Sequence, residues 1–151
     1  MTDSPTATAA RVPRAFWLSL LANALWINVS EVFRYFAFVM PMLRDAFPMI
    51  EGVAPMSLPV FGMWAIWDTI LVFAVTGYTW MFLERFGRSL RNAVYAGSTI
   101  WMAIFVILWL GMLNMRMATP GLLAVALPLS WLEMVIAALI VRWGMVRFAS
   151  D

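Results

Sequence analysis

Four charged side chains lie inside long apolar stretches of this sequence: Glu31, Arg34, Asp68 and Glu133. A charge in hydrocarbon costs at least about 2.5–3.5 kcal/mol on insertion scales, so residues of this kind usually have a partner or a function. Three carboxylates and one arginine sum to −2 if all of them ionise. We therefore expect protons or a bound cation to neutralise one or two of the carboxylates.

The residue types that the chain lacks exclude several kinds of chemistry. It has no Cys, His or Lys, which excludes disulfides, thiol redox chemistry, thiolate or imidazole metal sites and Schiff bases. Carboxylates alone can hold hard cations, but three are few for a two-metal hydrolase. We expect no metal site and no cofactor. A lipid-modifying enzyme is the third and least favoured interpretation, because the usual catalytic bases and nucleophiles are missing.

The elements that must position these residues are apolar and long. The chain is 64% hydrophobic and 12% charged, whereas soluble domains have about 45–50% and about 25%. A membrane-spanning helix needs about 20 apolar residues, and the sequence supplies such runs at residues 15–40, 58–83, 93–113 and 122–143. The sequence therefore predicts an all-α, four-helix transmembrane bundle, formed by one domain over residues 15–147. Residues 1–14 are polar and are expected to form a disordered cytoplasmic tail.

The arginines predict the orientation of this bundle. Seven of them fall on one side of a four-span arrangement, and only Arg44 and Arg116 fall on the other. Because Lys and Arg are enriched in cytoplasmic loops, we expect both termini in the cytoplasm and a multi-pass location in the inner membrane. The lipid bilayer is then the main partner. No dense basic cluster of the kind that nucleic-acid binding needs is present.

Spacing in the first span predicts an ion pair. Glu31 and Arg34 are three residues apart, so they can pair on one helix face. Asn28 lies three residues before Glu31, and Tyr35 lies four residues after it. Asn23, Ile27, Glu31 and Tyr35 are spaced four residues apart and form one polar stripe, and we expect Asn28 and Arg34 to flank this stripe.

The other two acids have different surroundings. Asp68 follows Trp64 and Trp67, and aromatic rings beside a carboxylate suit an amphipathic cation. Glu133 shares its helix side with small residues, which let helices approach closely, so this side is expected to face the bundle interior. The small residues are Ala126, Ser130, Ala137 and Gly144.

Two functions remain open from the sequence. In the first, the protein binds or transports a proton, a cation or a small amphipathic ligand at one carboxylate cluster. Its candidate residues are Glu31, Arg34, Asp68, Glu133, Asn28, Tyr35, Trp64 and Trp67. In the second, the protein is a non-catalytic accessory or assembly subunit, whose buried charges hold helices, a second copy or a membrane-protein partner together.

Overall fold

The computed structural model describes residues 13–148, and within this range all regular secondary structure is helical. The predicted N-terminal tail lies almost entirely outside the described residues, and Arg14 already begins the first helix. The chain forms four long helical rods, each long and apolar enough to cross a membrane. This architecture agrees with the predicted all-α bundle.

Two of the rods contain a short π-helical turn. The first rod consists of α1 (Arg14–Arg34), η1 (Tyr35–Val39) and α2 (Met40–Ala46), and the third of α4 (Leu90–Trp101), η2 (Met102–Val106) and α5 (Ile107–Asn114). The second rod is α3 (Leu58–Phe86), and the fourth is α6 (Pro120–Arg147). The last three rods begin and end within about one helical turn of the predicted positions.

The prediction that the first helix ends at Met40 is wrong. The rod continues through Pro41 to Ala46. In the π turn, the N–H of Met40 donates to the carbonyl of Tyr35 instead of the carbonyl four residues back. Proline has no N–H to donate to the helix. Because the π turn has already shifted the hydrogen-bond pattern just before Pro41, the helix tolerates this residue.

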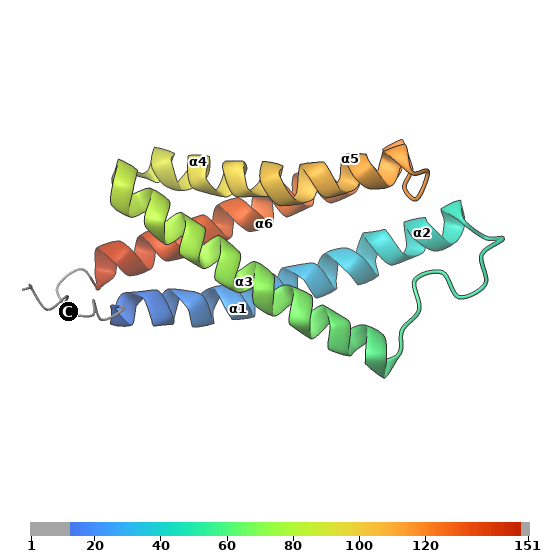
Figure 1. Ribbon diagram of the computed structural model, residues 1–151, viewed down its shortest axis with the longest axis horizontal. Coiled ribbons are helices and arrows are strands. Elements are labelled where there is room, and N and C mark those ends of the chain that lie inside the picture. Colours follow the sequence, from blue (N-terminus) through green and yellow to red (C-terminus); the bar gives the residue numbers. More distant parts are fainter. Residues whose placement is uncertain (1–12, 149–151) are drawn as a thin grey trace, which may run out of the picture.

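The rods pack around α6 (Figure 1). The N-terminal end of α1, the C-terminal end of α6 and the α3–α4 turn lie at one end of the molecule, and the loop from α2 to α3 lies at the other. α6 packs along α1 and α4, while α3 packs on all three. In its most apolar stretch, 44% of α6 is buried, against 22% in each other rod. α6 is thus the central helix.

Small residues allow this close packing, as the sequence predicted. The four small residues on the side of Glu133 are all buried. In α4, a methyl group added to Gly97 would lie 2.8 Å from the backbone oxygen of Met134 in α6. In α6, a methyl group added to Gly144 would overlap the Ser19 hydroxyl of α1. Glycine is therefore required where α4 approaches the backbone of α6, and at Gly144 the Ser19 side chain would have to move.

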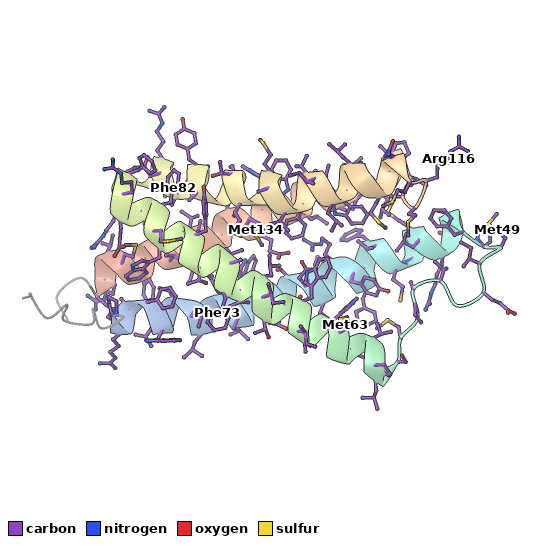
Figure 2. All side chains as sticks on the ribbon, in the orientation of Figure 1. Met49, Met63, Phe73, Phe82, Arg116 and Met134 are labelled. Atoms are coloured by element: carbon purple, nitrogen blue, oxygen red, sulfur yellow. The ribbon has the colours of Figure 1, made fainter. Side chains whose placement is uncertain are left out.

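Large apolar side chains cover much of the outer surface. On α3, Met63 and Phe73 are 64% and 50% exposed, whereas Met134 of α6 is completely buried (Figure 2). A soluble monomer rarely exposes apolar side chains over so wide an area. This surface is suited to contact with lipid.

Candidate ligand-binding site

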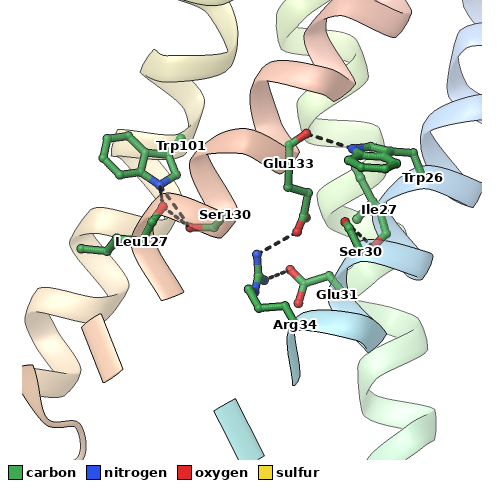
Figure 3. Close-up of polar contacts among 9 residues, drawn as sticks. All are labelled: Trp26, Ile27, Ser30, Glu31, Arg34, Trp101, Leu127, Ser130 and Glu133. Atoms are coloured by element: carbon green, nitrogen blue, oxygen red, sulfur yellow. Dashed lines mark hydrogen bonds and ion pairs between the residues drawn. The ribbon is translucent and has the colours of Figure 1, made fainter. Parts of the chain in front are cut away.

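Arg34 connects two carboxylates at the middle of the bundle (Figure 3). One of its terminal nitrogens pairs with Glu31 on the same helix, and the other lies 2.7 Å from Oε2 of Glu133 on α6. The side chains of Arg34 and Glu133 are only 8% and 2% exposed. The expected Glu31–Arg34 pair is present, and Glu133 adds a second partner that the sequence did not indicate.

Two π turns border this ion-pair triad of Glu31, Arg34 and Glu133. The turn η1 starts directly after Arg34. The turn η2 carries Phe105, whose ring centre lies 5.1 Å from the guanidinium carbon of Arg34. A cation over an aromatic ring at this distance is stabilised by the ring quadrupole. π turns are rare and often occur at functional sites.

Glu133 is held from its backbone as well as from its side chain. The indole N–H of Trp26 on α1 donates to the backbone carbonyl of Glu133 at 3.0 Å (Figure 3). Its Oε2 accepts from Arg34, but Oε1 is buried and has no hydrogen-bond partner among the described residues. One carboxylate oxygen therefore remains for a further donor.

Asp68 lies in a separate part of the site, at a cavity of about 170 Å³. We call it the Asp68 cavity. Its polar side chains are Glu31, Arg34 and Asp68, and its aromatic side chains are Tyr35, Trp64, Trp67, Phe105 and Trp109. Asp68 is 8% exposed, and in residues 13–148 its carboxylate takes part in no hydrogen bond or ion pair. The cavity thus combines five aromatic side chains with a carboxylate that has no partner within the described residues.

Most of the predicted site residues reach this region, and one does not. Asn28 is exposed on α1, and its amide donates to the carbonyl of Ala24 at 2.8 Å. Asn28 lies six residues before Arg34, which places it about 120° around the helix from the guanidinium. Asn28 was predicted as a site residue, but it lines neither cavity beside Arg34.

The three acids do not meet in one cavity. Glu31 and Asp68 line the Asp68 cavity, whereas Glu133 reaches it only through Arg34. In the described part of the chain, no group of three acidic side chains lies close enough together to hold a metal ion. The single carboxylate cluster expected from the sequence is therefore two adjoining groups linked by one guanidinium.

The third rod supplies residues that sequence reasoning missed. Phe105 and Trp109 close the Asp68 cavity, and Trp101 donates from its indole to the carbonyl of Leu127 and the hydroxyl of Ser130 on α6 (Figure 3). Their spacing of four residues places them on one helix face, and this was the available signal. It was overlooked because aromatic residues are also common on surfaces that face lipid.

A buried polar pair farther along the bundle was also missed. The amide of Asn23 on α1 donates to the hydroxyl of Thr76 on α3 at 3.0 Å, and both residues are completely buried. Asn23 lies two helical turns before Glu31 on the same stripe. This bond joins α1 to α3, as the triad joins α1 to α6.

The arrangement is suited to a cation rather than an anion. When ionised, the triad carries −1 and Asp68 adds −1. Aromatic rings present their negative faces to cations, and aromatic cages are a common way to bind quaternary ammonium groups. In comparisons with protein-family models, curated proteins and solved structures, nothing matches this chain, so its function must be argued from its own residues.

Proposed function

We propose that this chain spans a membrane four times and binds a cation in the Asp68 cavity, where it takes up a proton or a small amphipathic organic cation. The observation that supports this most strongly is the Asp68 carboxylate. It is nearly buried, faces a cavity with five aromatic rings, and has no partner among residues 13–148.

Charge balance favours a site that exchanges a proton for a cation. Two negative charges in excess are costly to keep inside a membrane protein. A proton or an organic cation at Asp68 removes one of them. Because the two occupants compete for the same carboxylate, a cation that enters the cavity displaces a proton. Such exchange is the basis of proton-coupled transport.

The arrangement of helix ends supports the proposed orientation. The start of α1, the α3–α4 turn and the end of α6 share one end of the molecule. Arginines are concentrated at this end of the molecule. We therefore place this end in the cytoplasm and the protein in the inner membrane. The chain has no native Cys, so single cysteines can test the topology. In intact cells, Ser57→Cys should react with a membrane-impermeant thiol reagent and Ser89→Cys should not. The reverse labelling would contradict the orientation.

A direct binding measurement tests the ligand. The full chain in lipid nanodiscs should bind benzyltrimethylammonium, which combines one aromatic ring with a permanent charge, and release protons into weakly buffered solution. Asp68→Asn should weaken binding at least tenfold, equivalent to about 1.4 kcal/mol. The matched control Asp45→Asn makes the same change at an exposed residue at the end of α2 and should leave binding unchanged. Absence of binding, or equal binding by both variants, would refute the proposal.

The second candidate is a non-catalytic accessory or assembly subunit. The observation that favours it is the triad itself, because Arg34 joins α1 to α6 without needing any ligand. On this proposal, the wild-type protein binds no cation, and substitutions in the triad change stability or the recovery of a co-purifying partner.

A further inference from the structure

A second cavity, of about 140 Å³, lies between α1 and α6 and shares only Arg34 with the Asp68 cavity. We call it the Glu133 cavity. Its remaining residues are Trp26, Ser30 and Phe33 of α1 and Leu129, Leu132 and Glu133 of α6. Two cavities thus meet at the same guanidinium from different faces of α1.

The Glu133 cavity contains an unused acceptor. Glu133 is 2% exposed, and its Oε1 has no donor among the described residues. The Trp26 indole is occupied by the Glu133 carbonyl, and the Ser30 hydroxyl, which lies close to the Glu133 carboxylate, donates to the carbonyl of Ile27. Leaving a buried acceptor unpaired is unfavourable. A ligand in this cavity that carries an N–H donor would satisfy it.

The mouth of the cavity is apolar and lies on the side of the bundle. Phe33 and Leu132 line it and are 59% and 48% exposed. Phe33 lies near the middle of the first rod, and Leu132 lies near the middle of α6. In a membrane, this mouth faces the hydrocarbon. The occupant must therefore be apolar enough to arrive through lipid.

We propose that the Glu133 cavity is a second ligand site, which takes an apolar primary or secondary amine from the bilayer. The bound ammonium donates to Oε1 of Glu133, and its apolar body packs against Trp26, Phe33 and the two leucines. One cation neutralises the −1 of the ionised triad. A cavity of about 150 Å³ lined by apolar side chains holds one benzene ring, so an amine with a single ring is of suitable size. The site rests on the proposed membrane location but not on the Asp68 cavity.

Two probes separate the two cavities. Benzylamine has N–H donors when protonated, whereas benzyltrimethylammonium has none. Leu132→Trp fills the mouth of the Glu133 cavity without touching the ion pairs, and Leu110→Trp makes the same change at a similarly exposed leucine, 53% against 48%. Each variant is measured in nanodiscs, with empty nanodiscs correcting for partition into lipid.

Benzylamine is measured in an Asp68→Asn background, because the Asp68 cavity would also accept this cation. In that background, benzylamine binding should weaken at least tenfold when Leu132→Trp is added and remain unchanged when Leu110→Trp is added. Benzyltrimethylammonium binding should survive Leu132→Trp, which also shows that this variant is folded. The inference is overturned if benzylamine does not bind, as expected for a cavity that holds only water. It is also overturned if Leu132→Trp leaves benzylamine binding intact, or if Asp68→Asn abolishes it. Failure of the quaternary probe alone would refute the Asp68 cavity and leave the Glu133 cavity standing.

Discussion

Replacing Arg34 with Met tests the central role of the triad. Methionine keeps an apolar stem, while the charge and the cation–π contact of the guanidinium with Phe105 disappear. The carboxylates of Glu31 and Glu133 are then left without their shared partner. We expect a large loss of stability from this single change.

The magnitude follows from the burial of the three side chains. Glu133 is 2% exposed at its side chain and Glu31 is 18% exposed, so solvent can relieve only the second. Removing one partner of a buried ion pair costs about 3–5 kcal/mol. Removing all the charges together is often nearly neutral, because no charge is left unpaired. The triple variant Glu31→Gln, Arg34→Met, Glu133→Gln should therefore lie within about 2 kcal/mol of wild type.

Reversible unfolding in detergent micelles, followed by tryptophan emission, measures these differences. Arg85→Met is the matched control, since Arg85 is exposed at the end of α3. It should change the free energy of unfolding by less than about 0.5 kcal/mol.

Two outcomes would refute this reasoning. If Arg34→Met costs less than about 1 kcal/mol, the triad contributes no more than a typical surface ion pair. If the triple variant is as unstable as Arg34→Met, the loss comes from packing rather than from unpaired charge. In either case the argument that a cation is needed to balance the site loses its basis.

Three further changes test the packing and the hydrogen bonds between helices. Gly97→Ala places a methyl group 2.8 Å from the backbone of α6 and should lower the free energy of unfolding by about 1–3 kcal/mol in the same assay. In the control Gly111→Ala, the methyl group meets no atom within 4 Å, so the stability should stay the same or rise slightly. Asn23→Ala should lower the free energy of unfolding by about 0.6–2 kcal/mol. Adding Thr76→Ala should lower it little further, because both changes remove the same hydrogen bond. Full additivity would show that the two side chains are independent. Trp26→Phe deletes the indole donor to the α6 backbone and should lower the free energy of unfolding by about 0.6–1.7 kcal/mol. An unchanged unfolding midpoint would show that this hydrogen bond does not contribute to stability.

Local features of the site could be predicted from sequence. The pairing of Glu31 with Arg34 depends only on a spacing of three residues in one helix, and the structure contains it. The inward orientation of Glu133 followed from the small residues on its side of α6, and Glu133 is indeed buried. These predictions succeed because helix periodicity places residues of the same helix relative to one another.

Other features could not be predicted in this way. Asn28 was predicted as a site residue beside the polar stripe, but the packing of α1 leaves its side chain exposed. The continuation of the first rod past Pro41 depends on a π turn, which has no simple sequence signal. Phe105 lies opposite Arg34 because α4 and α5 pack with a particular rotation. Each of these depends on the contacts of a helix with its neighbours.

The four charged residues show where the division lies. The sequence by itself determined that Glu31, Arg34, Asp68 and Glu133 sit in apolar helices, that the first two can pair, and that their charges do not cancel. Only the tertiary structure decided that Arg34 also reaches Glu133, 99 residues away, and that Asp68 is left without a partner among the described residues. Periodicity sets directions within one helix, whereas the relative rotation and depth of two helices come from how all their side chains pack together. That packing divided one expected cluster into two cavities on either face of one arginine.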